Sequence, residues 1–114
     1  MSANVLLVLE DGDLRSRLIQ ELGRCGCQVL PVRSAHSALI VLRQFPGTLD
    51  LLLTAEDLAG MSGSQLGRIA CREREALRVI LLNEGMEQVL QQVQAVLSVS
   101  AHTGTTATSY PITR

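Results

Sequence analysis

The sequence predicts an α/β domain built around a parallel β-sheet. Four short runs of apolar residues alternate with segments whose apolar residues recur at helical spacing. Strands this apolar are covered on both faces, and strands that alternate with helices pair in parallel. With 114 residues, the chain has room for one such domain, residues 1–114. The four predicted strands span residues 5–9, 28–32, 49–54 and 77–82.

The first half of the chain supplies two strand–helix units. Glu-Asp-Gly-Asp ends the first strand, and we expect Asp13 to cap the helix that follows. Pro31 removes a backbone donor from the second strand, which favours a position at the sheet edge. Ser34 is expected to cap a second helix that runs to Phe45 and is closed by a Pro-Gly pair.

The second half adds two more units and a polar end. The third strand leads into a turn over 55–63, and Ser64 is expected to open the third helix. The fourth strand leads to an amphipathic helix over 86–97. Residues 98–114 read as irregular, with 109–114 as a possible fifth strand. Because parallel connections are right-handed, the helices should cover both faces of the sheet.

Composition excludes several classes of function. The net charge is −1 without a basic cluster, which argues against a nucleic-acid surface. All ten cationic side chains are arginine, so no lysine can form a Schiff base. Cys25, Cys27 and Cys71 are too few for a disulfide framework or a zinc site. No stretch reads as a signal peptide or reaches the ~20 apolar residues of a membrane span. We expect a cytoplasmic protein that contacts neither nucleic acid nor membrane.

Acidic residues follow two of the predicted strands. Glu10 and Asp11 come after the first strand, and Glu56 and Asp57 come after the third. Ligands of such sheets bind at the carboxyl ends of the strands, where carboxylate oxygens can hold a hard divalent cation. Acidic residues are also common in solvated turns. Of the four, Glu10 and Asp11 are the magnesium candidates. The chain has no phosphate-binding glycine loop and no nucleophile turn, so we expect neither an enzyme nor a bound cofactor.

Three stretches resemble the receiver domain of response regulators. VLLVLEDGDLRSRL resembles its opening, in which a strand ends in acids that are followed by a proline or glycine, Asp, Leu and Arg. LDLLLTAEDLAGMSG resembles its middle, which ends in a P-G-M-D-G turn, and LRVILLNEG falls at the fourth strand. The resemblance covers about residues 4–97. It implies a three-layer flavodoxin-like (CheY-like) parallel sheet of order 2-1-3-4-5.

The receiver family implies a phosphorylation site that this chain has lost at most positions. In the family, an Asp after strand three accepts a phosphoryl group from the histidine of a kinase. An acid pair holds magnesium, and a Ser or Thr and a Lys bind the phosphoryl oxygens. Here the acceptor position is Ala55 and the acid pair is Leu9 and Glu10. The hydroxyl position is Asn83, and Arg114 is the nearest substitute for the lysine. The resemblance therefore implies a degenerate (pseudo-) receiver.

The end of the chain leaves two alternatives open. Either 86–97 is the fourth helix and the fifth helix is absent, or 86–97 is the last helix and the fourth helix and fifth strand have been lost. We favour the first, because TSYPITR resembles the end of a fifth strand. In both cases part of the apolar surface would lack its usual cover. Burying such surface contributes roughly 25 cal/mol per Å², so we expect it to bind a partner. The expected interaction residues are Met86, Val89, Leu90, Val93 and Tyr110.

Three hypotheses about function follow. The leading one is a phosphorylation-independent receiver-like module of a two-component-type signalling or transcription regulator. It would be the N-terminal part of a longer regulator and would bind a second copy of itself or another signalling protein. The second is a phosphoreceiver that uses a non-standard acid, Glu56 or Asp57. The third is a small ligand-binding domain with Glu10 and Asn83 lining a pocket.

Overall fold

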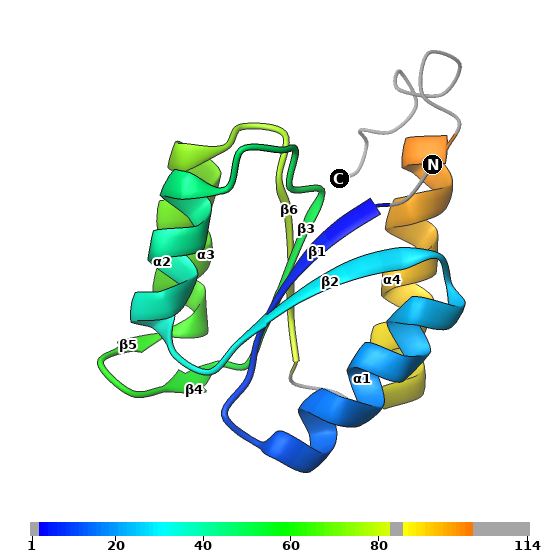
Figure 1. Ribbon diagram of the computed structural model, residues 1–114, viewed down its shortest axis with the longest axis horizontal. Coiled ribbons are helices and arrows are strands. Elements are labelled where there is room, and N and C mark those ends of the chain that lie inside the picture. The colour runs from blue at the N-terminus through cyan, green and yellow to red at the C-terminus, as the bar shows by residue number, and fades with distance from the viewer. Residues whose placement is uncertain (1–2, 83–85, 102–114) are drawn as a thin grey trace.

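The central sheet has four parallel strands in the order β2-β1-β3-β6, with helices on both faces (Figure 1). The structure is a computed structural model and describes residues 3–82 and 86–101. It confirms the predicted parallel sheet. Each of the four predicted strand–helix units contributes one strand, and β6 is the strand of the fourth unit, so the order agrees with the predicted 2-1-3-4. The elements are β1 (Ala3–Val8), α1 (Gly12–Arg24), β2 (Cys27–Val32), α2 (Ala35–Gln44), β3 (Leu51–Thr54), β4 (Asp57–Leu58), β5 (Met61–Ser62), α3 (Gly63–Glu73), β6 (Arg78–Leu81) and α4 (Met86–Ala101).

The two central strands are the most apolar, as their sequences predict. All four residues of β3 are buried, and so are the last four residues of β1. Helices on both sides of the sheet exclude water from these strands, which is why neither shows an alternating polar pattern. Pro31 lies exposed in the edge strand β2, where the missing backbone donor costs no hydrogen bond between strands.

Two hydrophobic cores lie on opposite faces of the sheet (Figure 1). Side chains along each strand alternate between them, so Leu7 and Leu53 enter one core while Leu6 and Leu52 enter the other. The first core lies under α1 and α4, and the second lies under α2 and α3. The core is almost entirely aliphatic, and Phe45 packs only at the edge of the second one.

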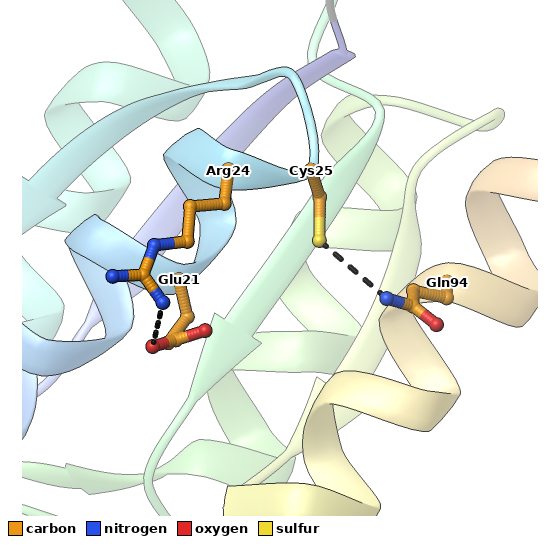
Figure 2. A network of polar contacts seen from close by, with 4 residues as sticks. All are labelled: Glu21, Arg24, Cys25 and Gln94. Carbon is orange, nitrogen blue, oxygen red and sulfur yellow. Dashed lines mark hydrogen bonds and ion pairs between the residues drawn. The ribbon is translucent and has the colours of Figure 1, made fainter.

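The position of α4 decides between the two alternatives for the end of the chain. Val89 and Val93 are buried in the core that α1 also covers, and the amide of Gln94 donates to the Cys25 sulfur over 3.7 Å (Figure 2). If a further parallel strand followed β6 at the sheet edge, a right-handed connection would place the helix between them on the opposite face, the one that α2 and α3 cover. Helix α4 is therefore in the place of a last helix. The alternative that we favoured from the sequence, a fourth crossover helix, is not the one observed.

Two helix caps, one turn and one helix end differ from the predictions. Asp11 rather than Asp13 caps α1, and Ser62 rather than Ser64 caps α3 through a capping box with Gln65. The turn predicted after β3 contains a small hairpin, β4–β5. Helix α4 continues to Ala101, four residues into the segment read as irregular. The possible fifth strand over 109–114 lies outside the described residues.

Candidate functional site

The register of the sheet brings the ends of three strands to one level. Val8 pairs with Thr54, and Thr54 pairs with Leu81. The next residue of each strand continues the ladder, because the Ala55 amide donates to the Val8 carbonyl at 3.1 Å and the Leu82 amide donates to the Thr54 carbonyl at 2.8 Å. Leu9, Ala55 and Leu82 therefore form one row at the edge of the sheet where a ligand of this fold class would bind.

This row is apolar and belongs to the hydrophobic core. Leu9 is 5% exposed and lies within the core under α1 and α4, and half-buried Ala55 and Leu82 pack against the same core. A nucleophile or metal ligand at these positions would need an oxygen, nitrogen or sulfur atom, and none of the three side chains has one. The row can exclude water, but it cannot accept a chemical group.

Glu10 and Asp11, the magnesium candidates, each hold a different part of the backbone. The Glu10 carboxylate accepts from the Ala59 amide at 3.2 Å, across the sheet edge in the β4–β5 turn. The Asp11 carboxylate accepts from the Leu14 amide at 3.1 Å and so caps α1. Within residues 3–82 and 86–101, no three acidic, histidine or cysteine side chains gather as a metal-binding group.

Glu56 and Asp57 follow the acceptor position, and their surroundings differ. The Glu56 carboxylate accepts from the Ser64 amide at 2.9 Å and from the Ser64 hydroxyl at 2.8 Å. It thus satisfies a free backbone donor in the first turn of α3. Asp57 is exposed in β4 and pairs through its backbone with Ser62 in β5. Both residues are exposed, and Glu56 is the one whose carboxylate is held by hydrogen bonds to α3.

Arg15 also contributes to this end of the sheet, although no motif in the sequence indicates it. Its guanidinium donates to the Leu9 carbonyl at 2.8 Å and reaches the Glu10 carbonyl at 3.5 Å, so it holds the loop between β1 and α1. Arg15 stands one helical turn after the capping Asp11, and that spacing is the only sequence signal for this role. The other cationic position that we considered, Arg114, lies outside the described residues, as do Asn83 and Tyr110.

The residues expected to contact a partner are mostly internal. Val89 is 1% exposed and Val93 is fully buried, while Leu90 packs against the same core. Their stripe is the inner face of α4, so it is not available to a partner in this structure. Because α4 covers the sheet of its own chain, a partner cannot reach Val89 or Val93 in this structure, and contacts through the other expected residues stay a prediction. The side chain of Met86 lies outside the described part.

The cysteines are free and do not form a reactive pair. Cys25 and Cys27 are half-buried, and Cys71 is exposed. Burial raises the pKa of the Cys27 thiol, and the neighbouring Cys25 and Asp50 raise it further. A raised thiol pKa lowers the thiolate fraction at neutral pH, which makes Cys27 a poor nucleophile.

Solved structures share this arrangement of strands and helices. No protein-family model matches the sequence, and neither does any curated protein. A CheY-like response regulator receiver domain from Methanospirillum hungatei superposes with a TM-score of 0.76 at 16% identity, over 91% of this chain and all of that one. The receiver domain of the hybrid histidine kinase CckA gives 0.69 at 20% identity, over 83% of this chain and 99% of that one. The chain has the receiver fold.

A third solved structure, the HemR receiver domain from Leptospira biflexa, is also similar to this chain. That comparison gives a TM-score of 0.71 at 17% identity, over 85% of this chain and 95% of that one. At these identities the likeness concerns the fold, and the row at the strand ends must be judged from its own residues. Among the described helices, none is long and apolar enough to cross a membrane.

Proposed function

We propose that this chain is a regulatory and protein-interaction module with the receiver fold that works without phosphorylation. One observation carries the proposal: Ala55, at the acceptor position, sits in an apolar row with Leu9 and Leu82. A phosphoryl transfer needs a nucleophile aligned within about 3.5 Å of phosphorus, and a methyl group offers none. The module would act in the cytoplasm by binding another protein of a two-component-type signalling or transcription pathway.

The engagement of the nearby acids supports the same reading. Glu10 and Asp11 hold backbone amides on two different segments, so a magnesium ion would compete with hydrogen bonds that both carboxylates already make. The Glu56 carboxylate accepts two hydrogen bonds from Ser64 in α3. Recruiting any of these carboxylates for chemistry would leave backbone donors without partners at a loop or a helix end.

The alternative is a phosphoreceiver that uses a non-standard acid, and the exposure of Asp57 keeps it testable. Wild-type protein is incubated with acetyl phosphate and magnesium and analysed by intact mass spectrometry. We expect no mass gain of one phosphoryl group. A functional receiver domain treated in parallel provides the positive control.

Two sets of variants make the outcome decisive. If the wild type gains a phosphoryl group that Asp57→Asn or Glu56→Gln abolishes, the chain is a phosphoreceiver and our proposal is wrong. Ala55→Asp restores a carboxylate at the acceptor position, but we expect it to stay unmodified because Leu9 still occupies the position of a magnesium ligand. Phosphorylation of Ala55→Asp alone would show that the rest of the site is more intact than its side chains indicate.

A further inference from the structure

A groove of about 640 Å³ lies between α3 and β6, away from the row at the strand ends. It is on the face of the sheet that α2 and α3 cover, on the side of α3 that is turned away from α2. One wall is α3 and the floor is β6. The lining residues are Ser64, Gly67, Arg68, Cys71, Arg72, Val79 and Leu81.

The groove is open because α4 covers the other face. Within the described part of the chain, β6 is the last strand of the sheet, and no helix follows α3 on the same side (Figure 1). Side chains of β6 alternate between the faces. Ile80, which points to α4, is 6% exposed, whereas Val79 and Leu81 on the groove side are only half-buried. The apolar floor thus lacks a cover that its opposite side has.

The shape of the groove suits a helix. The α3 residues that line it recur every three or four positions from Ser64 to Arg72, so they form one stripe over eight residue steps. At 1.5 Å per residue this stripe is about 12 Å long, or roughly two helical turns. A helix laid along it at the usual 8–10 Å from α3 would also contact Val79 and Leu81. A strand added to the edge of β6 would leave the wall of α3 uncovered.

The charge of the groove indicates what kind of helix fits. Arg68 and Arg72 lie one turn apart on its wall, and both are exposed. Like charges at this spacing destabilise a helix slightly. The ion pairs of the described residues are Arg24–Glu21 and Arg43–Glu73, so neither groove arginine is neutralised within the described chain. The nearby Glu56 carboxylate is bound to Ser64 at the end of the groove.

The described residues of a second copy of this chain do not offer the complementary surface. Ile40 is the single exposed large hydrophobic residue in the described part, and the apolar stripes of the helices face the two cores. A two-fold arrangement of grooves would also bring Arg68 and Arg72 of one copy towards those of the other, and like charges in contact oppose association.

We propose that the groove between α3 and β6 binds an amphipathic helix of another protein, with an apolar stripe for Val79 and Leu81 and acidic residues one turn apart for Arg68 and Arg72. This inference rests on the proposed function, since it names the surface through which the module acts. Phosphoryl transfer does not involve the groove, so the mass-spectrometric test of the proposed function and the binding test of the groove fail in ways that can be told apart.

Two synthetic helical peptides test the proposal. Both carry the same leucine and isoleucine stripe, and one has glutamates spaced four residues apart where the other has lysines. Binding to the chain is measured by fluorescence anisotropy at low and high salt. Because exposed charge pairs contribute up to about fivefold each, we expect the glutamate peptide to bind roughly tenfold more tightly and to lose this advantage at high salt.

Cys71 reports where the peptide binds. It lines the groove and is exposed, so a bound helix should slow its alkylation by iodoacetamide. The double variant Arg68→Glu, Arg72→Glu should reverse the preference to the lysine peptide. The matched control is Arg17→Glu, Arg33→Glu, which makes the same change in net charge at exposed sites outside the groove and should keep the glutamate preference.

Three results would overturn the proposal. The first is equal or absent binding of the two peptides to the wild type. The second is a glutamate preference that the groove variant keeps or that the control variant loses. The third is a dimer in sedimentation that protects Cys71 without any peptide, since that would make a second copy the occupant.

Discussion

Gly63 and Ala55 approach each other at the end of β3, and their backbones leave no room for a side chain on Gly63. A methyl group there would overlap the Ala55 carbonyl oxygen. The Gly63 amide also donates to the Glu56 carbonyl at 2.8 Å, which ties the first turn of α3 to the acceptor position. The same contact therefore sets the position of α3 and of the backbone around Ala55.

Gly63→Ala should destabilise the protein by at least about 2 kcal/mol, because the overlap involves rigid backbone atoms that cannot move aside. Chemical denaturation measures the free energy of unfolding. Gly23→Ala is the matched control, since a methyl group on Gly23 in α1 would meet no atom within 4 Å. The control should gain roughly 0.5–1 kcal/mol from the better helix propensity of alanine. Equal effects of the two changes would contradict the close approach.

At the scale of the elements, Arg74 links the C-terminal end of α3 to the C-terminal end of α2. It stands just after α3, and its guanidinium donates to the carbonyls of Leu42, Phe45 and Gly47 at 2.9, 2.6 and 2.7 Å. These carbonyls lie at the end of α2 and in the loop beyond it, where backbone acceptors lack helical partners. One side chain thus closes α2 and holds it against α3.

Arg74→Met should lower the free energy of unfolding by about 2–3 kcal/mol, since three carbonyls lose a charged donor. Arg74→Lys should recover only part of this, because an ammonium group cannot reproduce the planar arrangement of donors. Arg72→Met is the control and should change stability by less than about 0.5 kcal/mol, as Arg72 is exposed. A full recovery with lysine would show that charge rather than geometry matters.

For the whole molecule, the side on which α4 packs decides which surfaces are free. With α4 beside α1, the first core is closed, while α3 covers the other face of β6 only in part. The contact between Gln94 and Cys25 lies at the outer edge of this packing, and the ion pair of Arg24 with Glu21 lies next to it on α1 (Figure 2). Both polar contacts are exposed or weak, so buried apolar contacts must hold α4 in place.

Val93→Ala tests this packing. Val93 is fully buried in the first core, so the change should cost about 1.5–3 kcal/mol of unfolding free energy without changing the oligomeric state. Gln92→Ala, on the exposed side of α4, should be neutral within about 0.5 kcal/mol. A Val93→Ala protein of unchanged stability but altered sedimentation would place this stripe in an interface between copies instead.

The sequence alone predicted the parallel sheet, the edge position of β2 and the row of Leu9 and Ala55 at the strand ends. These features depend on local periodicity and on the order of elements, which the chain carries directly. Helix caps were displaced by two residues at Asp11 and Ser62, because several neighbouring residues can cap equally well and the final choice depends on packing.

Tertiary structure alone decided where α4 packs, that Arg74 joins α2 to α3, and that a groove remains beside β6. The physical reason is the same for the place of α4 and for the groove. An amphipathic pattern shows that a helix has an apolar side, yet the same side fits either face of a sheet. Because α4 packs on the face of α1, α3 alone among the described helices covers the opposite face of β6 and leaves part of it open, with Arg68 and Arg72 on the wall of the groove.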